Sequence, residues 1–100
     1  MDVETVKTNV NEAARLLKAL SNDRRLMIVC VLCNEEKSVG ELERIVDLSQ
    51  SALSQHLARL RRDGIVKTRR DAQTIYYSLG CAMTKSLLNC LQSCLVEVRQ

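Results

Sequence analysis

Two consecutive helix signals, separated by a very short turn, dominate the middle of the chain. Ser38 and Glu41 match a capping box, in which a serine oxygen and a glutamate carboxylate accept hydrogen bonds from amides of the first helical turn. Only residues 47–48 then separate this helix from Ser49, which is placed to cap a longer helix that stops near Gly64. Two helices joined by so tight a turn indicate a helix-turn-helix unit.

The residues after Gly64 change from a helical to an alternating pattern. Residues 65–68 alternate, and Thr74–Leu79 is rich in strand formers, with a polar tip at Arg69–Gln73 between them. This pattern predicts a two-stranded hairpin with a basic tip. The apolar positions expected to face inward on the two preceding helices are Val39, Leu42, Ile45 and Val46 on the first, and Ala52, Leu53, Leu57 and Leu60 on the second.

Apolar residues at helical spacing predict three more helices around this unit. One runs from about Val3 to Leu20, a buried central helix covers Arg24–Leu32, and a final one runs from Met83 to Val98. The resulting order is four helices, a hairpin and a last helix, which is that of a winged helix-turn-helix. We therefore expect a mainly α fold with a small β-hairpin, and one domain over residues 1–100.

The two terminal helices carry more apolar surface than so small a core can cover. We expect this surplus to form a homodimer seam, although these residues could instead pack within one chain. The seam residues are Val6, Val10 and Leu17 in the first helix, and Leu87, Leu91, Leu95 and Val98 in the last.

Composition excludes several classes of protein. The chain has no proline and three glycines, which suits a helix-rich fold, and its two tyrosines are its only aromatic residues. A large aromatic-lined ligand pocket is therefore not expected. The apolar runs are too short to cross a bilayer and the N-terminus lacks a signal-peptide core, so we expect a cytoplasmic protein with no membrane contact.

Positive charge is concentrated in one short stretch. The net charge is only +3, yet residues 59–70 contain six lysines and arginines against the single acid Asp63. Such a cluster either marks a face for a polyanion or is a solvated helix end and loop. The basic residues are Arg59, Arg61, Arg62, Lys67, Arg69 and Arg70.

Three segments carry a family resemblance: "LLKALSNDRRLMIVCVL", "KSVGEL" and "LSQSALSQHLARLRRDGIVKTRRDAQTIYYSL". From about Ala13 to Leu79 the chain resembles the ArsR/SmtB family of bacterial repressors, and within it the branch that responds to sulfide-derived persulfides and oxidants. The resemblance implies a homodimer that binds an inverted-repeat operator in double-stranded DNA and releases it when an inducer acts.

In such a protein the second helix of the unit enters the major groove with its N-terminal half. Gln55 is the best candidate for a bidentate contact to adenine, and Arg59 for a guanine or phosphate contact. His56 is expected to pack or to touch phosphate rather than to bind a metal. The predicted DNA-contacting residues of this helix are Gln50, Ser51, Ser54, Gln55 and Arg59, and those directed at phosphates or carried by the wing are Arg61, Arg62, Arg69, Arg70 and Gln73.

The five cysteines are the candidate sensor. The resemblance implies that Cys30 matches the second-helix cysteine of the persulfide-responsive branch, which pairs with a cysteine near the end of the last helix. By counting along the chain, the partner position falls near Val96, whereas the available thiols are Cys90 and Cys94. We take Cys94 as the expected partner and Cys90 as the alternative, with a small thiol-reactive molecule as inducer.

Two further expectations concern the cysteines. An apolar packing role is the expectation for Cys33 and Cys81. Arg24 and Arg25 are expected to lower the pKa of the Cys30 thiol.

Two alternatives come from other classes of protein. A thiolate metal or arsenite sensor would bring Cys30 or Cys33 together with Cys90 and Cys94 across the dimer. The family's usual metal sites cannot be assembled, because the third helix has no cysteine and the last has no histidine or aspartate. The spacing of Cys30 and Cys33 is formally that of thiol oxidoreductases, but it lies inside a helix with no strand before it. We therefore expect no enzymatic activity and no cofactor.

Overall fold

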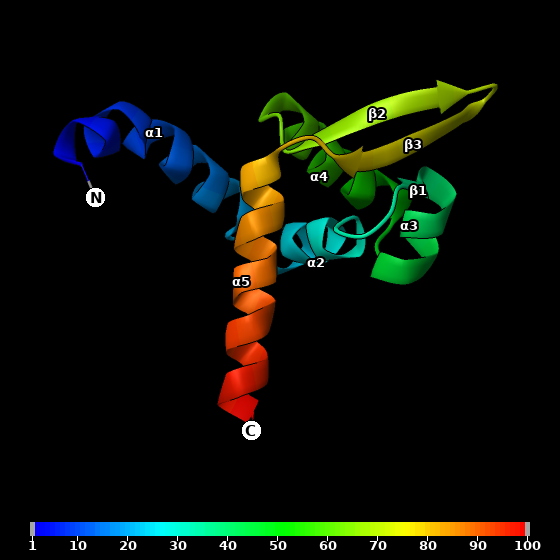
Figure 1. Ribbon diagram of the computed structural model, residues 1–100. Coiled ribbons are helices and arrows are strands. Elements are labelled where there is room, and N and C mark those ends of the chain that lie inside the picture. The colour runs from blue at the N-terminus through cyan, green and yellow to red at the C-terminus, as the bar shows by residue number, and fades with distance from the viewer. Residues whose placement is uncertain (1, 100) are drawn as a thin grey trace.

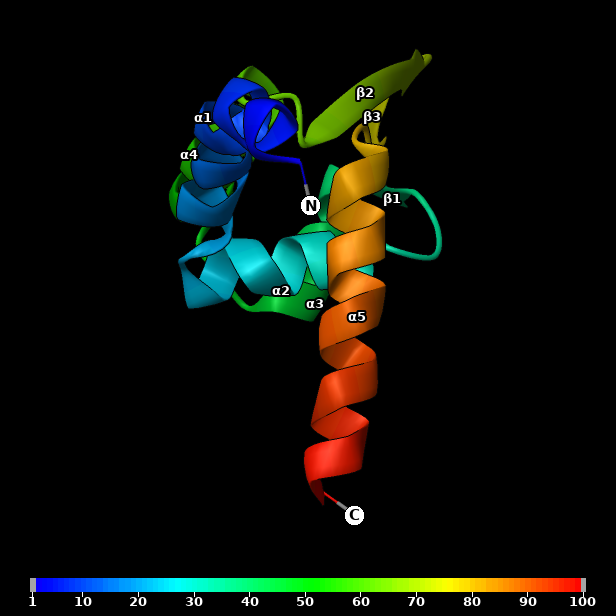
Figure 2. The ribbon, with the colours of Figure 1, turned by 60° about the vertical axis from the view of Figure 1, so that its left-hand side comes forward.

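The computed structural model describes residues 2–99, and side chains as far as residue 96. Within this range the chain forms five helices and one three-stranded sheet, arranged as in Figures 1 and 2. The predicted order of elements is confirmed, with one short strand added before the helix-turn-helix unit. The elements are α1 (Val3–Leu20), α2 (Asp23–Val31), β1 (Lys37–Ser38), α3 (Val39–Val46), α4 (Gln50–Arg62), β2 (Val66–Asp71), β3 (Thr74–Leu79) and α5 (Ala82–Arg99).

The predicted caps of α3 and α4 are confirmed. Ser38 Oγ accepts a hydrogen bond from the Glu41 amide at 3.2 Å, and Glu41 Oε1 accepts one from the Ser38 amide at 3.0 Å. Asp47 adopts a left-handed conformation with φ 57°, which turns the chain sharply between the two helices. Ser49 Oγ then accepts from the Ala52 amide at 3.1 Å. These local hydrogen bonds fix where the two helices begin and so fix their relative placement.

The glycine predicted to stop α4 forms a Schellman motif. Gly64 has φ 74°, a conformation that costs glycine little because it has no Cβ. Its amide donates to Arg61 O at 3.0 Å, and the next amide, that of Ile65, donates to Leu60 O at 2.9 Å. The chain leaves the helix with Ile65 and Val66 buried, so the wing starts from a fixed point on the core.

The sheet corrects the predicted hairpin in two respects. Its strand order is β1-β3-β2, and all neighbours are antiparallel. The third strand, β1, pairs Lys37 with Tyr77. The sequence did not predict this strand, because two residues are too few to show an alternating pattern. The predicted polar tip at Arg69–Gln73 is too long: Arg69 and Arg70 lie within β2, and only Ala72 and Gln73 make the turn. Strand pairing therefore extends almost to the end of the wing.

The core lies where α2, α3 and α4 meet the base of the wing, with the end of α1 and one turn of α5. Ile45 was predicted to face inward, but it is 43% exposed, because the buried face of α3 is narrower and consists of Leu42 and Val46. The buried apolar residues are Leu16, Ala19, Leu20, Ile28, Val29, Leu32, Leu42, Val46, Leu53, Leu57, Leu60, Ile65, Val66 and Leu88.

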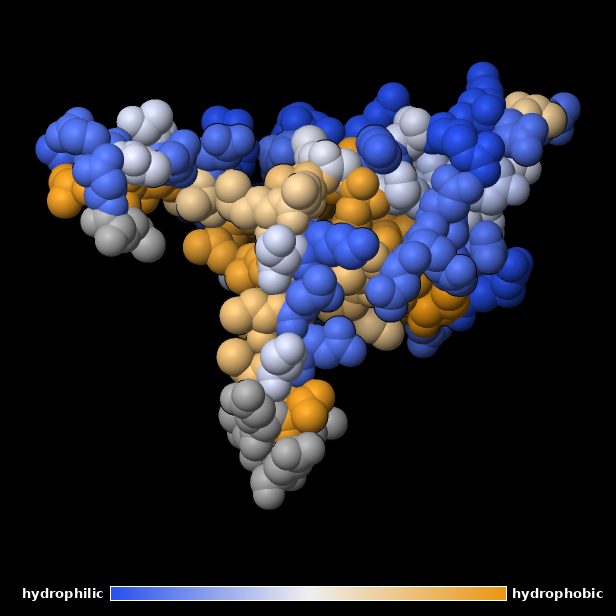
Figure 3. Space-filling view, in the orientation of Figure 1, coloured by the Kyte–Doolittle hydropathy of each residue, from blue (hydrophilic) through white to orange (hydrophobic). Residues whose placement is uncertain are grey.

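The two terminal helices extend away from this core (Figures 1 and 2). Helix α1 buries residues only in its last two turns, and Val10 in its free part is 50% exposed. Helix α5 buries Thr84 and Leu88, whereas Leu95 is 59% exposed. Figure 3 shows apolar residues along the underside of α1 and down the adjoining side of α5. The side chain of Val98, also predicted to lie in this seam, is outside the described residues.

None of the helices within residues 2–99 is both long enough and apolar enough to span a membrane.

Candidate nucleic-acid interface and cysteine sites

Helix α4 has one buried face and one polar face. Leu53, Leu57 and Leu60 are at most 2% exposed and anchor the helix in the core. On a regular helix, Gln55 lies on the side opposite these leucines, with Ser51 one turn before it. The predicted base-contacting residues Gln50, Ser51, Ser54 and Gln55 are all exposed. The polar face therefore offers hydrogen-bonding side chains on a rigidly packed helix.

Arg59 differs from the other predicted contacts because it is only half exposed. Its Nε lies 3.8 Å from Asp63 Oδ2, an acceptor at the end of the same helix. This Nε is buried and has no hydrogen-bond partner among the described residues. The side chain is thus held along α4 beside Asp63, rather than extended from the polar face.

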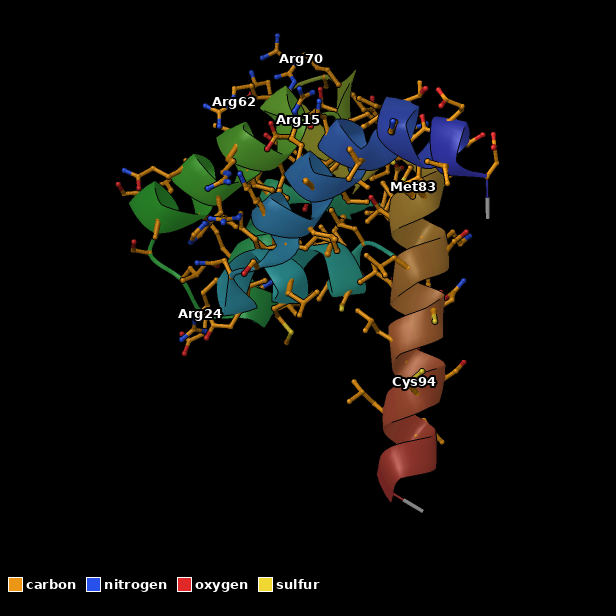
Figure 4. All side chains as sticks on the ribbon, turned by 90° about the vertical axis from the view of Figure 1, so that its left-hand side faces the viewer. Arg15, Arg24, Arg62, Arg70, Met83 and Cys94 are labelled. Carbon is orange, nitrogen blue, oxygen red and sulfur yellow. The ribbon has the colours of Figure 1, made fainter. Side chains whose placement is uncertain are left out.

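A solvent-open cleft of about 510 Å³ separates α4 from the base of the wing. Ser54, Arg61 and Arg62 line one wall, and Tyr77 of β3 lies opposite. Figure 4 shows Arg62 and Arg70, from α4 and β2, along the same upper edge of the molecule. Guanidinium groups along one edge suit the phosphates of a nucleic-acid backbone.

Arg69 was predicted to contact phosphate, but an intramolecular partner already holds it. Its guanidinium pairs with both carboxylate oxygens of Glu36, with an Nε–Oε2 distance of 3.2 Å, and lies 4.5 Å from the centre of the Tyr76 ring. The hydrogen bond to Glu36 raises the pKa of Arg69, and the same bond lowers the pKa of Glu36. Arg69 therefore links strand β2 of the wing to the loop before β1. Arg70, next along the strand, and Gln73 in the turn remain exposed.

His56 packs against Arg25 instead of adding to the basic face. Its Nδ1 lies 3.4 Å from Arg25 Nη1, and Arg25 Nε donates to Ala19 O at 2.6 Å. Burial lowers the pKa of His56, and the neighbouring Arg25 lowers it further, so the imidazole is neutral at neutral pH. This contact ties α4 to α2 and to the end of α1.

Cys30 and Cys33 line a groove of about 290 Å³ between α2 and α5. Leu91 and Leu95 of α5 form the facing wall, and the Cys33 thiol lies 3.9 Å from Asn89 Oδ1. Burial raises the pKa of Cys30, and Cys33 raises it further. The expectation that Arg24 and Arg25 lower this pKa is wrong. Both guanidinium groups are directed elsewhere, with Arg24 Nη1 3.5 Å from Val46 O and Arg25 Nε bound to Ala19 O.

The expected partner Cys94 does not line the groove that contains Cys30, and neither does Cys90. Both are exposed and lie one turn apart on α5, each preceding a groove-lining leucine by one residue. One residue is a rotation of about 100° on an ideal helix, which turns both thiols away from the groove wall. Figure 4 shows Cys94 on the side of α5 that faces the viewer, whereas α2 lies beside the helix. Within one protomer the structure therefore separates Cys30 from both last-helix thiols.

Cys81 immediately precedes α5 and was expected to be a packing residue. Its carbonyl accepts the amides of Thr84 and Lys85 at 3.2 and 3.4 Å. Burial acts to raise the pKa of its thiol, but the hydroxyl and amide of Thr84 and the amide of Met83 would stabilise the thiolate more strongly, so the pKa of Cys81 is lowered. The sequence could have indicated this lowered pKa, because Cys81 lies just before the last helix, where the free amides of the first turn stabilise a thiolate.

The described part of one protomer does not assemble a metal site by itself. No group of three or more histidine, cysteine, aspartate or glutamate side chains comes together there with a spacing that could hold a metal ion.

Comparison with known proteins gives the family. The family model described as "Bacterial regulatory protein, arsR family" matches residues 22–68. The transcriptional activator HlyU of Vibrio cholerae is 47% identical over 100 residues, which cover all of this chain and 93% of that protein. The chain belongs to the arsR family. It is a DNA-binding transcriptional regulator and not an enzyme.

Solved structures agree with the fold of this arsR-family regulator. The transcriptional repressor BigR from Xylella fastidiosa matches with a TM-score of 0.86 and 46% identity, covering 93% of this chain and 95% of that one. A homodimeric winged helix-turn-helix DNA-binding domain from Mycobacterium bovis matches with a TM-score of 0.81 and 26% identity, covering 97% and 89%. The winged helix-turn-helix architecture expected from the sequence is confirmed.

The opposite pKa shifts of two cysteines in this regulator predict different pH profiles for their alkylation. Only the thiolate reacts, so Cys81, with its lowered pKa, reaches its full rate at a lower pH than Cys30, with its raised pKa. The ratio of Cys30 to Cys81 labelling by iodoacetamide should therefore rise between about pH 7 and pH 10. Peptide mapping of a Cys33→Ser variant measures it without interference from the neighbouring thiol. A ratio that stays constant or falls contradicts the shifts.

Proposed function

We propose that this regulator is a homodimeric repressor that binds an inverted-repeat operator and releases it when the Cys30 thiol reacts with a persulfide, another sulfide-derived species or an oxidant. In this proposal residues 1–100 act as one DNA-binding domain with dimerising terminal helices. The observation that carries the sensing step is the position of Cys30, an exposed thiol on the groove between α2 and α5.

The homodimer is supported by the uncovered apolar faces of α1 and α5. A helix that extends into water without tertiary contacts is marginal at this length, because most helical stability in proteins comes from packing of an apolar face. Val6, Val10 and Leu17 form such a face along α1, with Leu91 and Leu95 on α5. A second copy of the chain would cover all of them, and the relative from Mycobacterium bovis is homodimeric.

DNA binding is proposed through the polar face of α4 and the edge of the wing. Gln55 and its neighbours would reach base edges in the major groove, while Arg61, Arg62 and Arg70 would contact phosphates. Two-fold symmetry would place the two copies of α4 on half-sites about one helical turn apart, roughly 34 Å. Repression is proposed by similarity to the Xylella fastidiosa repressor, although the Vibrio cholerae relative carries the name of an activator.

The sensing step is coupled to DNA binding through α5 in this proposal. Helix α2 contacts α3 and α4 on one side, and its Cys30 borders α5 on the other. A sulfur adduct or bridge at Cys30 would change how α5 lies against α2. Because α5 contributes to the dimer seam, such a change would alter the spacing of the two α4 helices and weaken operator binding.

The test is a gel shift of the dimer on its operator under reducing conditions, with glutathione persulfide, with diamide and with arsenite. The proposal expects release by persulfide or diamide, no release by arsenite, and recovery on adding dithiothreitol. Cys30→Ser should bind DNA like the wild type and stay bound under every treatment. If the wild type stays bound throughout, or if Cys30→Ser is released like the wild type, the proposal is wrong; release by arsenite alone would favour a thiolate metalloid sensor.

A further inference from the structure

Cys33 is the thiol that shares a surface with Cys30. Both line the groove between α2 and α5, and Cys33 is close enough to act on the pKa of Cys30. Cys90 and Cys94 lie on α5, but they are outside the residues that line this groove. The nearest thiol that the fold offers to Cys30 is therefore on the same segment of chain.

The backbone between the two cysteines has a geometry that permits a direct bond. Helix α2 ends at Val31, and the Cys33 amide donates to Cys30 O at 3.2 Å, which closes a four-residue turn. Such a turn brings its first and last Cα atoms within about 7 Å. Disulfides span Cα separations of about 4.4–6.8 Å. Because the pair lies at the C-terminal end of the helix rather than at its middle, small adjustments cost few hydrogen bonds.

We propose that Cys30 and Cys33 close a disulfide with each other, and that this bridge is the oxidised state of the sensor. The inference rests on the proposed function and names the partner thiol that it left open. The chemical class of reagent is a low-molecular-weight hydropersulfide, RSSH, which the exposed Cys30 meets at the mouth of the groove.

The reaction has two steps. The Cys30 thiolate attacks the outer sulfur of RSSH, which breaks the S–S bond, releases RSH and leaves Cys30 as a persulfide. The Cys33 thiolate then attacks the Cys30 sulfur and expels hydrosulfide. Together two thiols and RSSH give one disulfide, RSH and H₂S, so the two cysteines lose two electrons and the persulfide gains them.

The bridge would act on α5 through the groove wall. In the reduced protein the Cys33 thiol reaches Asn89 Oδ1 of α5, and Leu91 and Leu95 complete the wall. Drawing Cys33 toward Cys30 removes this contact and changes the surface on which α5 rests. The link to DNA binding then passes through α5, without any thiol from that helix.

Tryptic mapping under non-reducing conditions tests the bridge directly, because cleavage sorts the cysteines into three peptides. Cys30 and Cys33 fall together in residues 26–37, Cys81 in residues 71–85, and Cys90 with Cys94 in residues 86–99. After treatment with glutathione persulfide and alkylation of free thiols, peptide 26–37 should have lost two hydrogen atoms and carry no alkyl group. A cross-link between peptides 26–37 and 86–99, or an unbridged peptide 26–37, overturns the inference.

Gel shifts of two variants separate this inference from the proposed function. Persulfide should weaken operator binding by the wild type and by the Cys90→Ser/Cys94→Ser double variant to the same extent, about 5- to 150-fold. For Cys33→Ser, the loss of operator affinity caused by persulfide should be less than a fifth of that factor. Cys33→Ala replaces this variant if the serine variant unfolds. Equal release of wild type and Cys33→Ser contradicts the bridge but leaves the Cys30 sensor intact. Failure of the wild type to release contradicts the proposed function, whatever the peptide map shows.

Discussion

Replacement of Val10 by glutamate will convert the regulator into a monomer that no longer holds its operator. Val10 is half exposed in the protomer, on the part of α1 that has no tertiary contacts, so the change leaves the protomer folded. In a two-fold dimer the carboxylate is buried twice without a partner, and each such burial costs several kcal/mol. Dimerisation should weaken by about 10³-fold or more, as measured by sedimentation equilibrium.

The operator affinity of Val10→Glu should fall together with its dimerisation. A monomer engages one half-site, so its Kd should move from the range of specific complexes, about 10⁻⁸ M or tighter, toward non-specific values of about 10⁻⁴–10⁻⁶ M. Thr8→Glu is the matched control, because it adds the same charge to the opposite face of α1, where Thr8 is exposed. A Val10→Glu protein that remains dimeric shows that α1 is not part of the seam.

Removal of the Gln55 side chain will have the second-largest effect, on the choice of DNA sequence. Gln55 is exposed on α4, and its amide is the side chain best suited to a bidentate contact with adenine. Losing that contact in both half-sites should cost about 2–6 kcal/mol, or roughly 30-fold to more than 10⁴-fold in affinity. Gln55→Ala should also lose discrimination at one position per half-site, as read from titrations against operators with single base-pair changes.

Arg62→Ala provides the contrasting result. Its guanidinium lies at the edge of the interface rather than at the centre of the polar face, so affinity should fall by a similar factor for every DNA sequence. The slope of log Kd against log salt should decrease by about 2, because one phosphate contact is lost in each half-site. Thermal unfolding of both variants should match the wild type, since both positions are exposed. If Gln55→Ala instead weakens all sequences equally, Gln55 does not read a base.

The sequence alone determined the helix-turn-helix unit and the order of the elements around it. The caps at Ser38 and Ser49, the turn at Asp47 and the glycine stop at Gly64 all lie where the residues predicted them. The caps and the glycine stop depend on hydrogen bonds between groups at most five residues apart, and the turn depends on one residue's backbone conformation, so all of them are local. The exposure of Gln50, Ser51, Ser54 and Gln55 followed from the same helical period.

The partners of individual side chains follow instead from how distant segments pack together. Strand β1 pairs with β3 across about forty residues, and this pairing brings Glu36 close to Arg69. Arg69, which the sequence predicted as a DNA contact, therefore forms an ion pair within the protein. The rotation of α5 about its axis turns leucines instead of Cys94 toward Cys30, and that rotation is set by how Thr84 and Leu88 pack in the core. Contacts between distant segments depend on the summed packing of the whole chain, and no local pattern encodes them.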